Sequence, residues 1–138
     1  MILVDSGALY ALADRDDTHH QRARSFFHQA KRQEMLAVPI PVVVEAALLL
    51  EARLGMRAIR ALWDDLLAGV FELLPVGPDT LLRARAIDRK HADAHLGIVD
   101  CTCLALCEHH RISTVFTFDR RHFAMYRPGF VRALRLVP

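Results

Sequence analysis

Short apolar segments alternate with longer helical patterns along the whole chain, and this alternation is what most constrains the fold. The apolar segments, several of them rich in β-branched residues, have the length and composition of buried strands. They lie at residues 2–4, 35–39, 71–76, 113–119 and 130–137. Strands separated by helices require crossover connections, so we expect a three-layer α/β/α fold around a central parallel sheet.

The segments between the strands show helical periodicity. Helices are expected at residues 6–14, 18–32, 41–53, 56–69, 78–93 and 98–110. In the fourth of these, five large apolar residues share one helical face before Gly69: Ile59, Leu62, Trp63, Leu66 and Leu67. The pattern predicts an amphipathic helix that ends near this glycine.

Length and cysteine content narrow the class of protein. A chain of 138 residues is the size of one domain, so we expect residues 1–138 to form a single domain. Cys101, Cys103 and Cys107 are odd in number and closely spaced, which predicts free thiols in a reducing cytoplasm. The longest apolar run, around residues 35–50, is interrupted by prolines and Glu45, so no membrane span is expected.

One carboxylate, Glu45, lies within the otherwise apolar segment "IPVVVEAALLL" at residues 40–50. An ionised acid in apolar surroundings costs several kcal/mol unless it is neutralised or paired. Three alternatives are open for Glu45. It reaches water at a helix edge, pairs with an arginine, or faces a cleft that holds a cation.

Three further acids are expected close to Glu45. Asp5 ends the first strand, Asp119 follows the strand in "STVFTFD", and Asp100 lies in the first turn of the helix at 98–110. In α/β sheets, ligands bind beyond the carboxyl ends of the strands, where the following helices begin. All four carboxylates therefore map to one edge of the predicted sheet.

Each acid alone has a simpler explanation. Asp5 and Asp119 are suited to capping helices or turns, Asp100 complements a helix dipole, and Glu45 has the alternatives given above. Together they are harder to explain, because two carboxylates about 4 Å apart repel by about 4 kcal/mol at an effective dielectric near 20. Hard divalent cations such as Mg²⁺ or Mn²⁺ neutralise such oxygen-rich clusters, so the four acids predict a metal site.

Four sequence blocks resemble those of PIN-domain nucleases in order and spacing, most closely the VapC-type toxins of prokaryotic toxin–antitoxin systems. They are "ILVDSGALYALAD", "PIPVVVEAALLL", "HLGIVDCTCLALCEHH" and "STVFTFDRRHF", and they span essentially the whole chain. The resemblance implies a compact α/β/α domain whose acidic site cleaves RNA with Mg²⁺ or Mn²⁺. The cysteines of "CTCLALC" depart from the small aliphatic residues usual there, which affects packing and leaves the acids unchanged.

The resemblance also implies a role for individual residues. It matches Asp5, Glu45, Asp100 and Asp119 to the catalytic, metal-binding acids of the family. Three of them, Asp5, Asp100 and Asp119, are expected to hold one cation, while Glu45 binds a second or positions the attacking water. Asp93 matches an accessory acid, and Ser6 and Thr117 match hydroxyls that support the site.

Basic residues are the candidates for holding RNA. Residues 120–138 contain five arginines and no acid, and Arg120 and Arg121 directly follow Asp119. We expect these two to steer phosphates toward the acids, although a solvated surface with scattered arginines is an equal alternative. His19-His20 and His109-His110 are interpreted as surface pairs.

Three functions fit these observations. The first is a metal-dependent endoribonuclease toxin, inhibited by a cognate antitoxin and forming a homodimer through its apolar helices. The second is a PIN nuclease that processes RNA outside toxin–antitoxin systems. The third is a PIN domain that binds without catalysis, which the presence of all four acids disfavours.

Overall fold

A parallel sheet of five short strands forms the centre of the molecule. The computed structural model describes residues 1–138 throughout. The strands are β1 (Ile2–Val4), β2 (Leu36–Pro39), β3 (Glu72–Leu74), β4 (Thr114–Phe116) and β5 (Arg135–Val137). Their order is β3-β2-β1-β4-β5, and every neighbouring pair is parallel. The predicted central parallel sheet is thus confirmed.

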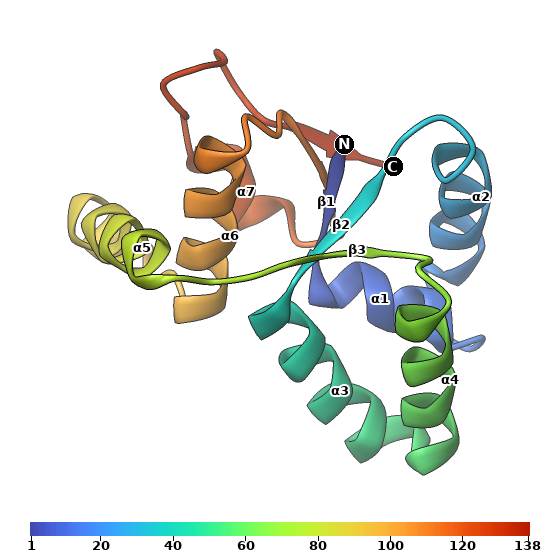
Figure 1. Ribbon diagram of the computed structural model, residues 1–138. Helices are drawn as coiled ribbons and strands as arrows, with labels where there is room; N and C mark the ends of the chain where they lie inside the picture. Colours follow the sequence, from blue (N-terminus) through green and yellow to red (C-terminus); the bar gives the residue numbers. More distant parts are fainter.

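Helices surround this sheet. They are α1 (Ser6–Ala13), α2 (His20–Ala30), α3 (Ile40–Leu54), α4 (Met56–Leu67), α5 (Pro78–Lys90), α6 (Ile98–His109) and α7 (Arg120–Met125), with a 3₁₀ turn η1 (Ala92–Ala94) before α6. In Figure 1, α5 and α6 stand on one side of the sheet and α2 on the other. The paired helices α3 and α4 extend beyond the end of the sheet at which β1 and β2 finish. No helix combines the length and the apolar character that crossing a membrane requires.

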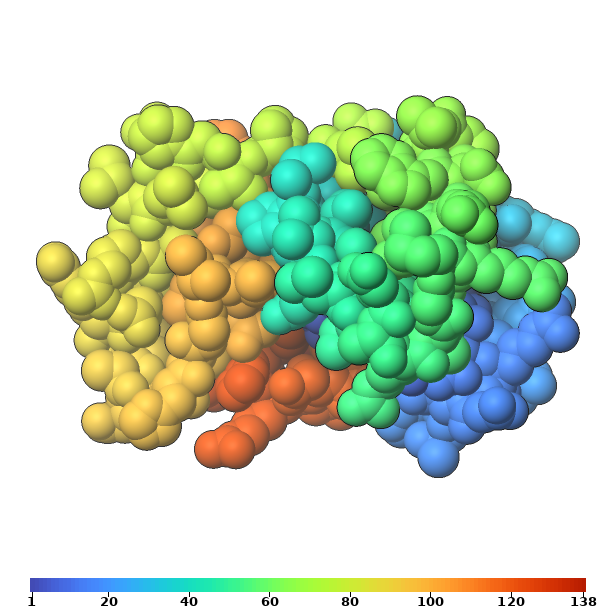
Figure 2. Space-filling model, turned by 90° about the horizontal axis from the view of Figure 1, so that it is seen from below, coloured from blue at the N-terminus to red at the C-terminus, as the bar shows by residue number.

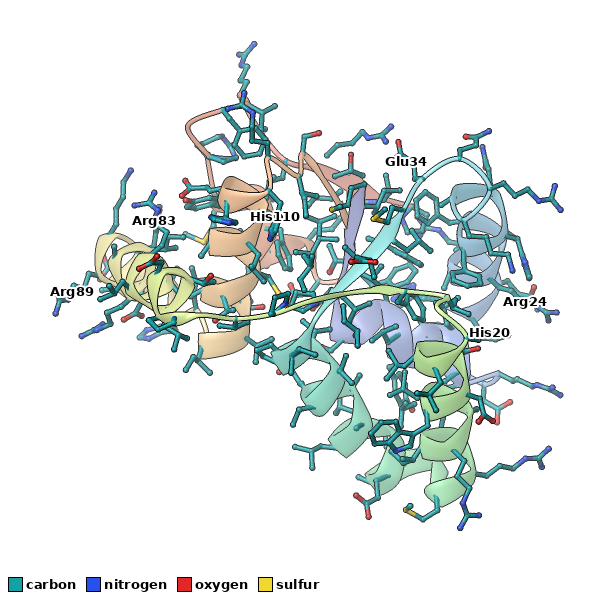
Figure 3. The ribbon with its side chains drawn as sticks, viewed as in Figure 1. His20, Arg24, Glu34, Arg83, Arg89 and His110 are labelled. Carbon is teal, nitrogen blue, oxygen red and sulfur yellow. The ribbon has the colours of Figure 1, made fainter.

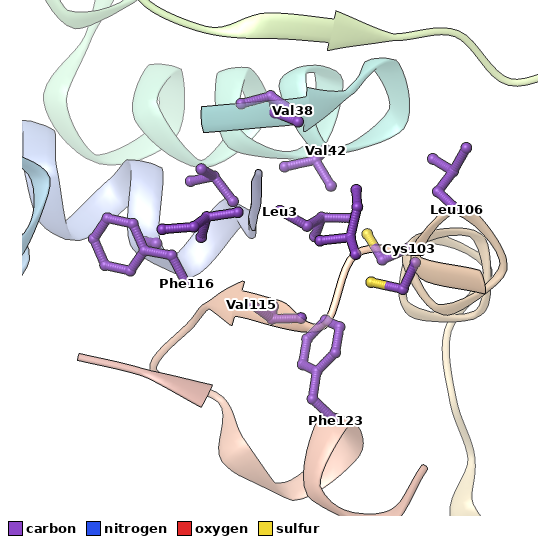
Figure 4. Packing of buried hydrophobic residues seen from close by; sticks show 14 of the residues in the cluster. Leu3, Val38, Val42, Cys103, Leu106, Val115, Phe116 and Phe123 are labelled. Carbon is purple, nitrogen blue, oxygen red and sulfur yellow. The ribbon is translucent and has the colours of Figure 1, made fainter. Parts of the chain in front are cut away.

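The core lies between the sheet and the helices on its two faces. Every residue of β1, β2 and β4 is buried, which explains why these strands are continuously apolar rather than alternating. Helix α6 is buried from Cys101 to Cys107, and its three cysteines are free thiols. Figure 4 shows Cys103 directed toward Leu3 and Val115 of the sheet.

The structure departs from the sequence-based expectations in three places. Trp63 and Leu67 of α4 are 60% and 81% exposed, although they share the apolar face that was expected in this helix. Helix α7 was not predicted, because six residues with one buried side chain, Phe123, give too short a pattern. His20 is buried, so interpreting His19-His20 as a surface pair was wrong for this residue.

Candidate active site

Four acids from four separate elements lie at the carboxyl edge of the sheet. Asp5 follows β1 as the residue before α1, and Asp119 caps α7 beyond β4. Asp100 is in the first turn of α6, and Glu45 is in the second turn of α3. Seen from this edge in Figure 2, the start of the chain is visible only at the bottom of a depression between α3, α6 and α7. The sequence-based expectation that the acids share this edge therefore agrees with the fold.

Asp5 is the most buried of the four, with 6% of its surface exposed. The Thr117 hydroxyl donates a hydrogen bond of 2.9 Å to its Oδ2 atom, and no lysine, arginine or histidine pairs with it. Burial is the main cause that raises the pKa of Asp5, the hydrogen bonds from Thr117 and the Ser6 backbone oppose it, and the charges of Asp100 and Glu45 add to it, for a net pKa of about 6. The pocket thus holds a carboxylate without a compensating positive charge.

The structure excludes one of the three alternatives for Glu45. Its Oε2 atom accepts a hydrogen bond of 2.5 Å from the Ser6 hydroxyl, and it forms no ion pair with an arginine. Its side chain is half-buried and acts electrostatically on both Asp5 and Asp100. The arginine alternative for Glu45 is therefore excluded, and its carboxylate lies within electrostatic range of Asp5 and Asp100.

His122 joins the two remaining acids. Its Nδ1 atom lies 2.9 Å from Asp100 Oδ2 and 3.6 Å from Asp119 Oδ2. Burial raises the pKa of Asp100, and the charges of Asp119 and Glu45 raise it further, while His122 opposes them. The sequence reasoning missed His122, because its position three residues after Asp119 has meaning only once α7 is known to be a helix.

Of the remaining candidates, only the two hydroxyl residues contact the acids through their side chains. Ser6 and Thr117 touch the acids, as described above. Asp93 does not, since it is exposed in η1 and no hydrogen bond or ion pair joins it to the four acids. Arg120 and Arg121 are exposed at the start of α7 beside Asp119, and Arg120 donates a hydrogen bond to the carbonyl oxygen of Pro138.

The donor set suits a hard divalent cation. It consists of carboxylate oxygens, one of them buried and uncompensated, at a place where α1, α6 and α7 begin and their N–H groups favour negative charge. No three His, Cys, Asp or Glu side chains are assembled closely enough to enclose an ion by themselves. Mg²⁺ does not require such an enclosure, because it keeps several waters and binds directly to only one or two carboxylates.

Comparisons with known proteins agree on the family. The family model of the PIN domain matches residues 2–128. Ribonuclease VapC26 of Mycobacterium tuberculosis is 31% identical over 127 residues, which cover 92% of this chain and 93% of that protein. Its sequence therefore aligns with this chain over nearly the full length of both.

Solved structures show the same fold. VapC20 of Mycobacterium tuberculosis, described as a sarcin–ricin loop cleaving toxin, superposes with a TM-score of 0.83 at 25% identity, covering 96% of this chain and 98% of that one. A toxin–antitoxin complex from Klebsiella pneumoniae has a TM-score of 0.67 at 17% identity, with 91% and 92% covered. The chain therefore belongs to the PIN-domain family and, within it, to the VapC-type ribonucleases, the toxins of toxin–antitoxin systems.

Proposed function

We propose that this protein hydrolyses phosphodiester bonds within RNA with Mg²⁺ or Mn²⁺ held by Asp5, Glu45, Asp100 and Asp119. The observation that carries the proposal is Asp5, which is buried, lacks any basic partner and is flanked by Asp100 and Glu45. A pocket that keeps a carboxylate in this state has an unmet need for positive charge. A bound cation meets that need.

The side chains around the acids fix their orientation. Thr117 holds Asp5, Ser6 holds Glu45, and His122 lies against Asp100. Asp119 accepts a hydrogen bond from the Arg121 backbone N–H, so each of the four carboxylates is restrained by a neighbour. When bound, a divalent cation lowers the pKa of water and neutralises charge that develops on the phosphate. We assign to Glu45, which the Ser6 hydroxyl orients, the role of positioning the attacking water.

RNA is the substrate that the relatives indicate. VapC26 is named a ribonuclease, and VapC20 is described as cleaving the sarcin–ricin loop. Arg120 and Arg121, exposed beside Asp119, are the residues of this chain that we assign to the RNA phosphates. Three buried free thiols and an RNA target fit a protein that acts in the cytoplasm.

A cognate antitoxin is the protein partner that we propose. A groove of about 770 Å³ runs between α1, α2, α3 and α4 and is lined by 18 residues. Leu9, Phe27 and Leu50 contribute to its apolar floor, and charged side chains such as Arg24 and Asp65 form part of its wall. An amphipathic peptide segment of the antitoxin fits such a groove, because its apolar face covers the floor and its polar face meets the charges.

A second copy of the chain is the other partner. Four large apolar side chains are more than 60% exposed on four different helices: Leu48 at 63%, Leu67 at 81%, Leu82 at 71% and Ile98 at 76%. Contiguous apolar patches often mark protein interfaces. We propose that a face built from some of these side chains contributes to a homodimer.

The proposed chemistry is tested by replacing acids without changing their size. Asp5→Asn and Asp100→Asn should each reduce RNA cleavage by more than about 100-fold, because each removes a carboxylate from the cation site. Cleavage by the wild type should stop in EDTA and return with Mn²⁺. Asp64→Asn on the exposed face of α4 is the matched control, and circular dichroism verifies the fold of each variant. Full activity of both Asp5→Asn and Asp100→Asn would contradict the proposal.

A further inference from the structure

An aromatic pair joins the turn before α2 to the segment that carries Asp119. The His19 imidazole stacks on the Phe118 ring with the centroids 4.3 Å apart and the planes 10° from parallel. Phe118 stands between Thr117, which hydrogen bonds to Asp5, and Asp119. While its two neighbours contact the acid site, Phe118 turns to His19 and Phe116. Phe118 is thus the direct sequence neighbour of two residues of the acid site, Thr117 and Asp119.

The His19 ring is held in place by its neighbours. The backbone N–H of His19 donates a hydrogen bond of 2.7 Å to Asp17 Oδ1, which fixes the turn before α2. The buried ring of His20 anchors the same turn to α1, with its Nδ1 atom 2.8 Å from the Ala11 carbonyl oxygen. His19 itself is exposed. Its ring stacks on Phe118, while the residue as a whole remains accessible to solvent.

Each residue of the stacked pair has an arginine close to it in the sequence, and the two arginines meet at Pro138. Arg22 follows His19 by three residues, and Arg120 follows Phe118 by two. Both guanidinium groups donate a hydrogen bond to the backbone oxygen of Pro138, at 3.2 Å and 2.6 Å. Neither forms an ion pair with an aspartate or glutamate side chain. Each retains further N–H donors in the fork geometry that suits phosphate.

We propose that His19, stacked on Phe118, is a platform for one unpaired base of the RNA, and that Arg22 and Arg120 hold a phosphate beside that base. This assignment rests on the proposed ribonuclease function and adds a substrate requirement to it. Every nucleobase has a π-face, so stacking accepts any base but requires one that is free of a duplex. The platform therefore selects single-stranded nucleotides next to the bond that is cleaved.

Binding without cleavage tests the platform. On the inactive Asp5→Asn background, oligoribonucleotides carry 2-aminopurine at successive positions around the mapped cleavage site. His19→Ala should weaken binding by roughly 5- to 150-fold, the range for loss of one stacked base, and should abolish quenching of 2-aminopurine at one position. His19→Tyr, which restores a ring, should recover both. His109→Ala, an exposed histidine at the far end of α6, is the control and should bind like the parent protein.

The kinetics of the active enzyme separate this role from a structural one. His19→Ala should raise KM and leave kcat and Mn²⁺ affinity within about 2-fold, because it removes binding of RNA and no ligand of the cation. Arg22→Ala and Arg120→Ala should each flatten the salt dependence of binding, whereas Arg89→Ala on α5 should not. Figure 3 shows Arg89 on the helix farthest from α2.

Two outcomes overturn the inference. If the wild-type protein cleaves RNA in Mn²⁺ and His19→Ala binds RNA and quenches 2-aminopurine like its parent, the platform is ruled out and the ribonuclease assignment stands. His19→Tyr behaving like His19→Ala also removes it, since the ring would then have no part in binding. Wild-type protein with no cleavage in Mg²⁺ or Mn²⁺ removes the proposed function and the platform together.

Discussion

Helix α6 carries an acid near each end, and the two acids are treated in opposite ways. Glu108, in the last turn, accepts two hydrogen bonds from Arg83, at 2.5 and 3.0 Å, and one of 2.5 Å from the Tyr126 hydroxyl. Arg83 lowers the pKa of Glu108. Asp100, in the first turn, has no arginine or lysine partner, and burial raises its pKa. One end of the helix is neutralised by an arginine, whereas the acid at the other end has only His122 beside it.

The difference shows what each region is for. The contacts of Glu108 link α5, α6 and the segment after α7, so its charge serves the fold. Asp5, Glu45, Asp100 and Asp119 have only hydroxyl groups, backbone N–H groups and His122 around them. Although the chain contains many arginines, none forms an ion pair with any of the four acids. Such an arrangement costs stability unless a cation is bound.

The largest effect on stability is expected for Asp5→Asn. The pKa of Asp5 rises from 3.8 to about 6 on folding, so between these values the folded protein binds a proton that the unfolded chain has released. Stability therefore falls as pH increases through this window, and the loss is complete above about pH 6. Asn carries no charge, so Asp5→Asn should raise the free energy of unfolding by up to about 3 kcal/mol at pH 8 in EDTA.

Urea unfolding at pH 4 and pH 8 measures this effect. The gain from Asp5→Asn should be present at pH 8 and absent at pH 4, where the wild-type Asp5 is itself largely protonated. A variant that is less stable than the wild type at pH 8 would show that Asp5 is already compensated within the chain.

Glu108→Ala should act in the opposite direction. It leaves the buried Tyr126 hydroxyl without its acceptor and Arg83 without its partner, which we expect to cost about 1–3 kcal/mol. Cleavage per folded molecule should be unchanged, because Glu108 lies at the end of α6 remote from Asp100. Urea unfolding and an RNase assay give both readings, with Glu51→Ala on α3 as the control. Loss of RNA cleavage in a fully folded Glu108→Ala variant would contradict the claim that Glu108 serves only the fold.

The smallest effect is expected at the surface next to the site. Arg121 is exposed beside Asp119, and removing one phosphate contact should weaken RNA binding a few-fold and reduce the slope of log K against log salt by about 1. Binding to inactive Asp5→Asn protein at several salt concentrations measures this slope. Arg60→Ala on α4 is the reference, and equal slopes for Arg121→Ala and Arg60→Ala would mean that Arg121 is an ordinary surface residue.

The sequence made the sheet and the acids predictable for one physical reason. Strands buried on both faces are continuously apolar, so a charge at the end of one, as at Asp5, stands out and its location follows from the topology of a parallel sheet. Asp100 reaches the same edge by a different connection, because α6 follows α5 and η1 and leads into β4, so its first turn lies where the parallel strands end.

Contacts between distant residues were beyond reach of that reasoning. His122 depends on α7, which is too short to give a periodic pattern. His20 is buried where its ring contacts the Ala11 carbonyl oxygen of another helix. The stack of His19 on Phe118 joins residues almost one hundred positions apart. No local pattern in the sequence indicates such pairs.

Calorimetric titration of Mn²⁺ into the metal-free protein tests the central claim most directly. The wild type should bind Mn²⁺, and Asp5→Asn and Asp100→Asn should bind it at least about 10-fold more weakly, because each lacks one of the charges that the ion compensates. Asp64→Asn should bind like the wild type. A wild-type protein that takes up no Mn²⁺, or both site variants binding it with unchanged affinity, would contradict the account.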